Sequence, residues 1–280
     1  MGVLFAFITN DAHRVRCSLD AHQQVLRVAQ QETTEGWGMG FYHGDEVLLK
    51  KRPQRSDGDL DFFALARDIR TEVLVGHVRH ATIGARTTEN THPFRFRQWM
   101  GAHVGTVDLF DEIRLDLLGS VPDFLRRNIR GQTDSEHLFH LFLAFLHDGG
   151  KLEDPTIGVE AAADALRATL AFLDRTVAAR GGKESPFNAV FTNGRVLLAS
   201  RRGRPLCVVR RTTMPECPVC TAEGEAMGRP KPVGHEHLRS VLLLSRTDAP
   251  TGNGWETIPE DSLVLVDRDL GIRVAPLKAP

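Results

Sequence analysis

Apolar runs separated by turn-forming residues predict short strands at both ends of the chain. Val3–Thr9 is the first expected strand and begins almost at the first residue. Short runs of apolar or alternating residues, bounded by turn-forming residues, predict further strands over 37–42, 47–50, 73–78 and 99–104. The last hundred residues return to strands, expected over 188–192, 196–200, 206–209, 241–245, 262–266 and 272–274.

Helical spacing dominates the middle of the chain. One helix is expected to begin at Thr133 or Asp134, and a second amphipathic helix covers 159–177. Shorter helices are expected after Ser18 and over 62–69. Strands therefore come first, helices follow and strands close the chain, and this segregated order predicts an α+β fold rather than a doubly wound α/β fold. Residues 1–280 are interpreted as one domain, in which the Pro-, Gly-, Glu- and Cys-rich segment 211–236 is an insertion or long loop.

Composition narrows the classes of function. The 280 residues carry 35 Lys and Arg against 36 Asp and Glu, a net charge of -1, which excludes a broad cationic surface for nucleic acid or an anionic membrane. The longest apolar stretch, from Leu138 to Leu146, is far shorter than the ~20 residues needed to cross a bilayer. The first residues lack the pattern of a signal peptide, and four cysteines do not make a disulfide scaffold. A cytoplasmic location is therefore expected.

Polar residues gather in short segments near the ends of the predicted strands, where binding groups usually lie. Taken singly, each has an ordinary structural explanation: a packed aromatic residue beside a tight strand, a surface pair, or a helix cap. The segments are Gly-Trp-Gly-Met-Gly at 36–40, His-Val-Arg-His-Ala-Thr at 77–82, Asn-Thr-His-Pro-Phe at 90–94, His-Val-Gly-Thr at 103–106 and Thr-Asp-Ser-Glu at 133–136.

Taken together, in this order and at this spacing, the segments form a specific pattern. The chain resembles the class II glutamine amidotransferases of the N-terminal-nucleophile type, and is most similar to the stand-alone bacterial subgroup that consists of the amidotransferase domain alone. The resemblance runs from Met1 to about Leu277 and includes the closing stretches 254–259 and 262–267. It implies a four-layer αββα sandwich that holds a glutamine site.

The resemblance also implies roles for individual residues. Arg79 would bind the α-carboxylate of the substrate, for which a fork of guanidinium donors is well suited. Asp134 would accept from the substrate ammonium group. Thr82 and Trp37 match positions that line the pocket, and the backbone N–H of Gly105 matches a donor of the oxyanion hole.

The sequence departs from the family pattern at its reacting groups. The family has a cysteine at residue 2, which becomes the N-terminal nucleophile when Met1 is removed, whereas this chain has Gly2. The family arginine that follows is Val3, and the asparagine that donates to the oxyanion is Val104. Losing one such donor typically lowers turnover about 10²–10³-fold. Cys17 lies beyond the first strand and is interpreted as a small buried apolar residue rather than a substitute nucleophile.

These departures favour a protein that keeps the fold and part of the amino-acid pocket but has lost glutaminase activity, and that acts by binding a small amino-acid-like ligand or a protein partner. The binding interpretation stands beside a structural one, in which Arg79 and Asp134 simply pair with each other. Two further hypotheses remain open: an active amidohydrolase or amidotransferase that uses the Gly2 amine or another group, and an interaction module held together by zinc. No segment resembles an ammonia-consuming synthase, so any acceptor chemistry would lie on another chain, and the partner is unknown.

One motif lies outside the amidotransferase pattern. Cys217 and Cys220 form a CxxC in the expected insertion, and His235 and His237 follow at a spacing compatible with four-coordinate zinc. Cys207 is a further candidate ligand. The alternative is two unligated loop thiols, and the Pro-rich surroundings do not favour the helix-opening CxxC of a thioredoxin-like protein. No cofactor is required by the expected chemistry, and a structural zinc is the one metal that the sequence suggests.

Overall fold

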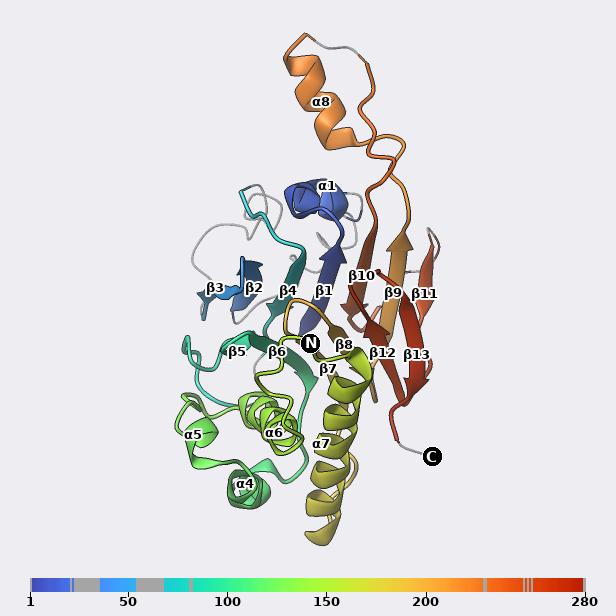
Figure 1. Ribbon diagram of the computed structural model, residues 1–280. Helices are drawn as coiled ribbons and strands as arrows, with labels where there is room; N and C mark the ends of the chain where they lie inside the picture. The colour runs from blue at the N-terminus through green and yellow to red at the C-terminus, as the bar shows by residue number, and fades with distance from the viewer. Residues whose placement is uncertain are drawn as a thin grey trace.

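The computed structural model describes residues 2–20, 22, 36–53, 68–80, 83–228, 231–248, 250, 252 and 254–278. Two antiparallel sheets pack face to face in the middle of the molecule (Figure 1). Sheet A has the order β11-β9-β10-β1-β4-β2-β3, with strands β1 Val3–Thr9, β2 Trp37–His43, β3 Glu46–Arg52, β4 Val73–Val78, β9 Leu206–Arg211, β10 Ser240–Ser245 and β11 Trp255–Thr257. Sheet B has the order β13-β12-β8-β7-β6-β5, with strands β5 Phe94–Phe96, β6 Trp99–Gly105, β7 Phe187–Thr192, β8 Leu197–Arg201, β12 Ser262–Val266 and β13 Ile272–Pro276.

The first strand lies in the centre of sheet A. β1 pairs with β4 on one side and with β10 on the other, so that Leu4 is opposite His77 and also opposite Ser245. All seven residues of β1 are buried, because the strand is covered on both faces. This pairing holds the start of the chain in the interior of the fold.

The space between the two sheets is filled by aliphatic side chains from their inner faces. Alternate β1 residues, Leu4, Ala6 and Ile8, face this layer, where Val104 of β6 also lies. The period-two alternation of a strand therefore determines which half of β1 meets sheet B. The other half, including Phe5 and Phe7, faces the outer side of sheet A.

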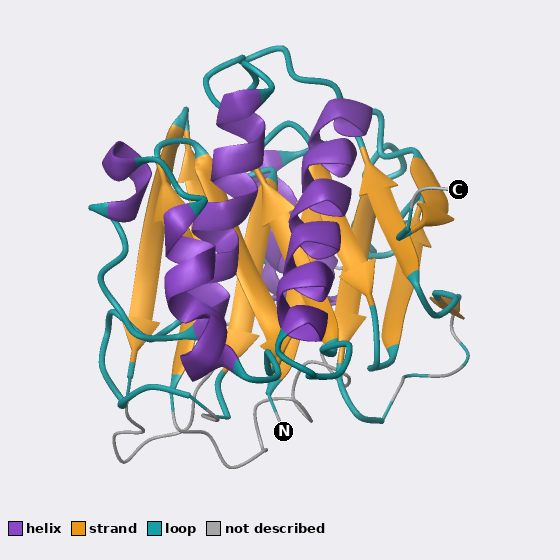
Figure 2. Cartoon of the chain, turned by 90° about the horizontal axis from the view of Figure 1, so that it is seen from below, coloured by secondary structure: helices purple, strands orange, loops and turns teal. Residues whose placement is uncertain are grey.

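Helices cover the outer face of sheet B (Figure 2). They are α4 Phe110–Gly119, α5 Asp123–Arg126, α6 Asp134–Asp148 and α7 Val159–Ala179. α6 begins where the sequence predicted, and Thr133 is its N-cap, accepting a hydrogen bond from the backbone N–H of Glu136 at 3.3 Å. The stacked rings of Phe142 and Phe191, with centroids 4.6 Å apart, join α6 to β7.

The outer face of sheet A carries a short helical segment, made of the 3₁₀ turn η1 Ala12–Arg14 and helix α1 Val15–Asp20. Val15 and Leu19 pack on the outward-facing side chains of β1. Helix, sheet, sheet and helix therefore follow one another as the four layers of the αββα class that was expected. Most of the helix predicted after Ser18 lies outside the described residues. The same is true of the helix predicted over 62–69, of which only residues 68 and 69 are described.

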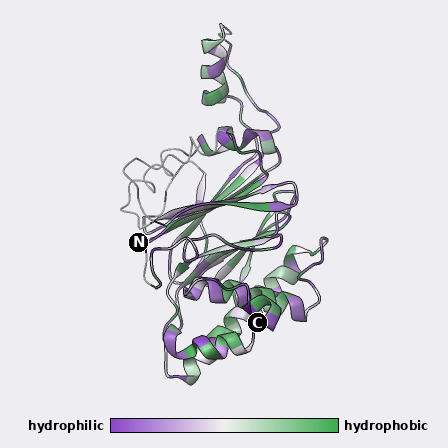
Figure 3. Cartoon of the chain, turned by 90° about the vertical axis from the view of Figure 1, so that its left-hand side faces the viewer, coloured by the Kyte–Doolittle hydropathy of each residue, from purple (hydrophilic) through white to green (hydrophobic). Residues whose placement is uncertain are grey.

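The segment between β9 and β10 projects from one end of the sandwich (Figure 3). It was expected to be an insertion or long loop over 211–236, but it contains helix α8 Pro218–Ala226. An isolated backbone bridge between Met214 and His235 joins its outgoing and returning segments. We call residues 212–239 the arm. Within the described residues, no helix is long and apolar enough to span a membrane.

The glycines of the 36–40 segment have a packing explanation. A Cβ atom on Gly38 would lie 1.8 Å from the backbone oxygen of His92, and one on Gly40 would lie 2.7 Å from Sδ of Met100. These glycines therefore let strand β2 of sheet A come close to the segment that leads into sheet B.

We expect Gly38→Ala to destabilise the protein by about 3 kcal/mol, because a backbone carbonyl cannot move aside as a flexible side chain can. Thermal unfolding should show a fall of about 2–4 °C in Tm for each kcal/mol lost. Gly119→Ala is the matched control: its added methyl group meets nothing within 4 Å, and we expect its Tm to be unchanged or slightly raised. Equal Tm values for the two variants would contradict this packing explanation.

Candidate functional site

A small pocket of about 60 Å³ opens beside the first residues of the chain. Five positions singled out in the sequence line it: Gly2, Arg79, Val104, Gly105 and Asp134. The remaining lining residues are His77, His80, Ile83, His92, His103, Thr133, Ser135 and Arg204. Segments separated by more than a hundred residues thus meet at the strand ends around Gly2.

Arg79 follows β4 directly and is 3% exposed. Its guanidinium group donates to the backbone oxygens of Ile83, Gly84 and Ala85, each at 3.0 Å. These bonds orient the buried cation at the pocket and brace the loop that follows it.

Asp134 is equally buried, at the first position of helix α6. Its Oδ2 accepts from the backbone N–H of Val107 at 2.9 Å, and its Oδ1 accepts from the backbone N–H of Ser135 at 2.8 Å. A carboxylate at a helix N-terminus is favoured by these donors and by the helix dipole. Among the described contacts, no ion pair joins Arg79 to Asp134, so the alternative in which the two simply pair with each other finds no support there.

Gly2, which stands where the resemblance implies the family nucleophile, lines this pocket. A Cβ atom built on Gly2 would lie 3.0 Å from the backbone oxygen of Val78 and 3.5 Å from Nε2 of His77. Val104 is 5% exposed, and its side chain packs in the aliphatic layer between the sheets. Gly105, the next residue, ends β6 at the pocket.

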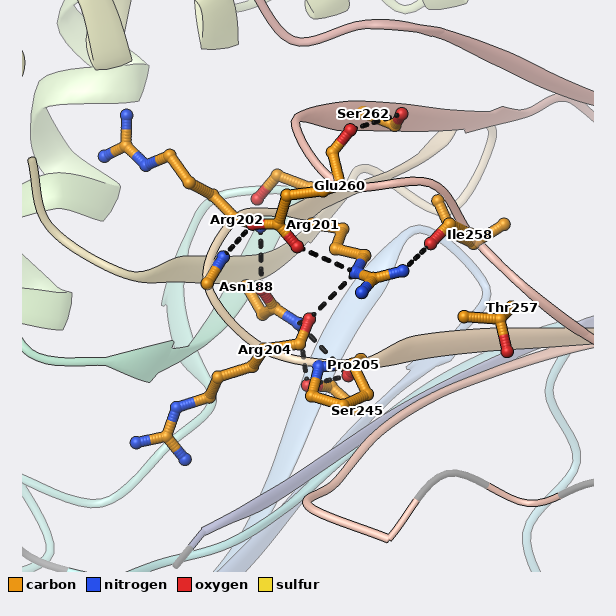
Figure 4. Close-up of polar contacts among 12 residues, drawn as sticks. Asn188, Arg201, Arg202, Arg204, Pro205, Ser245, Thr257, Ile258, Glu260 and Ser262 are labelled. Carbon is orange, nitrogen blue, oxygen red and sulfur yellow. Dashed lines mark hydrogen bonds and ion pairs between the residues drawn. The ribbon is translucent and has the colours of Figure 1, made fainter.

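Asn188, the residue opposite Val104 on the neighbouring strand, uses its side-chain amide for hydrogen bonds to other parts of the chain. Asn188 pairs with Val104 in the register of β6 and β7. Its Nδ2 donates to the backbone oxygen of Arg204 at 3.0 Å and to Oγ of Ser245 at 2.9 Å, and its Oδ1 accepts from the backbone N–H of Arg202 (Figure 4). Asn188 therefore holds the 202–205 turn and does not replace an amide donor at position 104.

Arg204 was not singled out in the sequence. Its backbone oxygen accepts from Asn188, while its guanidinium group extends away from these contacts (Figure 4) and lines the pocket. Partial burial lowers the pKa of Arg204 from its usual value, although arginine keeps its charge at neutral pH. An arginine in a turn after a strand carries no sequence signal of its own, so only the fold could reveal this second cation.

Three buried histidines stand around the same pocket. The rings of His77 and His92 have centroids 4.1 Å apart, and that of His103 stacks on Phe187 at 4.6 Å. Burial lowers the pKa of His77 to about 3 and lowers the pKa values of His92 and His103 below the ordinary range. The three imidazoles are therefore neutral at pH 7, and Arg79, Arg204 and Asp134 bring charged groups to the pocket.

One hydroxyl group of the pocket is close to a base. Oγ of Ser135 lies 2.9 Å from Nδ1 of His103 and donates to Oδ1 of Asp134 at 3.2 Å. In the sequence, Ser135 and His103 stand only as members of two polar segments, and nothing there indicates that they meet. Their contact ties β6 to the start of α6.

For the two further predicted pocket residues, the structure places only Trp37, which is not among the lining residues. Trp37 begins β2 and packs in the apolar cluster on the outer face of sheet A. Thr82 lies outside the described residues.

Three of the four predicted metal ligands lie together in the structure. Cys217, Cys220 and His235 lie together, and the fourth member is Cys17 of α1 rather than His237. The four ligand atoms all lie within 4.8 Å of one another and could hold a metal. His237 is exposed, and Cys207 is buried in β9, where its Sγ lies 3.7 Å from Oγ1 of Thr257. The CxxC also opens helix α8, although a helix was not expected there.

Known proteins resemble this chain in sequence and in structure. The family model for class II glutamine amidotransferases matches residues 1–222. The probable glutamine amidotransferase DUG3 of Saccharomyces cerevisiae is 28% identical over 209 residues, which cover 69% of this chain and 58% of the yeast protein. The putative glutamine amidotransferase YafJ of Escherichia coli is 32% identical over 111 residues, covering 38% of this chain and 40% of YafJ. The chain thus spans less than two thirds of either relative.

Solved structures agree on the fold. A glutamine aminotransferase class-II domain protein from Silicibacter pomeroyi superposes with a TM-score of 0.59 at 20% identity, covering 99% of this chain and all of the other. The glutamine phosphoribosylpyrophosphate amidotransferase from B. subtilis superposes with a TM-score of 0.56 at 13% identity, covering all of this chain and half of the other. With the family model matching well over half of its residues, the chain belongs to the class II glutamine amidotransferases.

Proposed function

We propose that this chain binds an acidic amino acid in the pocket of a class II glutamine amidotransferase and releases no ammonia from glutamine. The observation that carries the proposal is Gly2, which lines the pocket at the position of the family nucleophile. Glycine has no side chain to attack an amide, and no cysteine is among the lining residues. Val104 adds a second loss, because its apolar side chain offers no donor to an oxyanion.

The groups that would hold an amino acid remain at the pocket. Arg79 is suited to an α-carboxylate, and Asp134 to an ammonium group. Both are fixed by backbone hydrogen bonds, so little side-chain entropy would be lost on binding.

Arg204 supports an acidic rather than a neutral side chain on the ligand. It lines the pocket together with Val104 and Gly105, the two positions that the resemblance assigns to the oxyanion hole, where the reacting end of a glutamine side chain would lie. A guanidinium group there favours a carboxylate over an amide, because a charge-assisted hydrogen bond is roughly twice as strong as a neutral one. We therefore expect glutamate to bind more tightly than glutamine.

Calorimetric titration with glutamate, glutamine and alanine, together with an ammonia-release assay on glutamine, tests the proposal. We expect glutamate to bind, glutamine to bind at least tenfold more weakly, and no ammonia to be released above background. Arg204→Gln should remove the preference for glutamate, whereas Arg180→Gln, on an exposed ion pair with Asp116, should keep it. Ammonia release that disappears in Arg79→Ala, or failure of every amino acid to bind, would overturn the proposal.

The second candidate is hydrolysis of another amide with Ser135 as nucleophile. It rests on the 2.9 Å contact between Ser135 Oγ and Nδ1 of His103. In the tautomer with Nδ1 unprotonated, the hydroxyl group would turn from Oδ1 of Asp134 to donate to this neutral imidazole, which could then take its proton. Hydrolysis of a γ-glutamyl amide that is abolished by Ser135→Ala, in a variant that keeps the wild-type Tm, would favour this function. Equal background rates in the two proteins would exclude it.

A further inference from the structure

We propose that Cys17, Cys217, Cys220 and His235 form a structural zinc site that fastens the arm to helix α1. The four ligand atoms come together from segments far apart in the chain and lie within 4.8 Å of one another. Cys17 belongs to α1, Cys217 and Cys220 to the start of α8, and His235 to the returning segment of the arm.

The spacing of the ligand atoms fits a tetrahedral zinc ion. Zn–S bonds of about 2.3 Å and Zn–N bonds of about 2.0–2.1 Å place two sulfurs about 3.8 Å apart, and a sulfur and a nitrogen about 3.5 Å apart. Sγ of Cys17 lies 3.6 Å from Sγ of Cys220, and Nε2 of His235 lies 3.3 Å from the same sulfur. A disulfide would bring two sulfurs to about 2.05 Å, and all four cysteines of the chain are free.

The ligands are also held in place by the backbone around them. The N–H of Cys217 donates to the oxygen of Val233 at 2.8 Å, and Met214 and His235 exchange two backbone hydrogen bonds. These contacts keep His235 opposite the first turn of α8 without any contribution from the metal. A site built in this way loses little freedom when an ion binds.

The surroundings favour a structural rather than a catalytic ion. Cys17 and Cys217 are buried, and the apolar side chains of Met214, Val219 and Leu238 pack around the sulfurs. Four protein ligands leave no open position for water or substrate, which is typical of structural zinc. Binding would release the thiol protons and leave three thiolates on Zn²⁺ with a net charge of -1. NH1 of Arg14, 3.5 Å from Sγ of Cys220, would offset that charge.

The position of the site explains why the arm would need an ion. The apolar cluster that joins the arm to α1 has only a few buried members, and a core so small rarely holds a structure together alone. An exposed ion pair between Arg16 and Glu223 also joins the two elements, but exposed pairs contribute little. A metal bond across α1 and α8 would supply the missing stability.

Metal analysis of the purified full-length protein tests this inference. We expect about one zinc per chain, and less than a tenth of that in Cys17→Ser, Cys217→Ser or His235→Ala. Cys207→Ser and His237→Ala are matched controls, since these side chains lie outside the cluster, and both should keep the full zinc content. Cobalt substitution should give the absorption spectrum of a tetrahedral thiolate site.

A second measurement does not depend on the variants folding well. Treating the intact wild-type protein with a chelator should expose the arm to protease, and adding zinc back should restore its resistance. Purified protein without metal that does not take up zinc, a disulfide between Cys17 and Cys220 found by mass spectrometry, or loss of zinc from His237→Ala but not from His235→Ala would each overturn the proposal.

Discussion

Restoring both missing reacting groups should create glutaminase activity that neither substitution gives alone. Gly2→Cys supplies a thiol where the family has its nucleophile, once Met1 is removed, and its Cβ needs a shift of only a few tenths of an ångström from the oxygen of Val78. Val104→Asn supplies a donor to the oxyanion. We expect weak glutaminase activity from Gly2→Cys and none from Val104→Asn. The double variant should have an activity about 10²-fold or more above that of Gly2→Cys alone.

The two substitutions should be strongly non-additive, because an oxyanion donor stabilises nothing until a nucleophile attacks. Glutamate and ammonia would be measured after removal of contaminating enzymes, and thermal unfolding would show that each variant is folded. Protection of the new cysteine against alkylation by glutamine would report on Arg79 and Asp134. A folded double variant that binds glutamine but makes no glutamate would contradict the transfer of roles to these positions.

Acidification should destabilise the protein strongly between about pH 6.5 and pH 4. Burial lowers the pKa of His77 to about 3 and the pKa values of His22 and His140 to about 4. The unfolded chain, with ordinary histidines near 6.5, therefore binds more protons in this range, and the free energy of unfolding falls as the pH falls. At pH 5 each such histidine lowers it by about 2 kcal/mol, several kcal/mol in all.

Urea unfolding at pH 7.5 and pH 5 measures this loss. His140→Gln should reduce the difference between the two pH values by about 2 kcal/mol, whatever its effect on stability at either pH. Between pH 7.5 and pH 8.5 the same variant and the wild type should change in parallel, because the imidazoles are then neutral in both states. A pH dependence that is the same with and without His140 would show that the buried imidazole does not control it.

The sequence predicted the strands and the long helices that are buried on well-defined faces. β1 was clear because it is apolar on both sides, and α6 because a capping threonine precedes an apolar helical face. α4 was missed, since only Phe110, Ile113 and Leu117 of its ten residues are buried and the pattern is sparse. α8 was missed because proline and glycine in the segment argued for a loop.

The residues of the site also divide into those that the sequence could predict and those that it could not. Arg79 and Asp134 could be singled out because they stand in recognisable segments, and the fold brings them to one pocket. Arg204 could not, because nothing local distinguishes it from other surface arginines. Cys17 was assigned to the core and His237 to the metal, since spacing along the chain favours near neighbours, whereas the fold brings α1 to residues about two hundred positions away.

The central position of β1 has a consequence for synthesis. β1 completes its pairing with β10, whose residues Ser240–Ser245 are synthesised more than two hundred residues after it. At about 5–20 residues per second, an apolar strand waits roughly 10–50 s with one edge unpaired. Such an edge is a template for aggregation. The yield of recombinant protein should therefore depend on chaperones and on growth temperature more than on the stability of the finished fold.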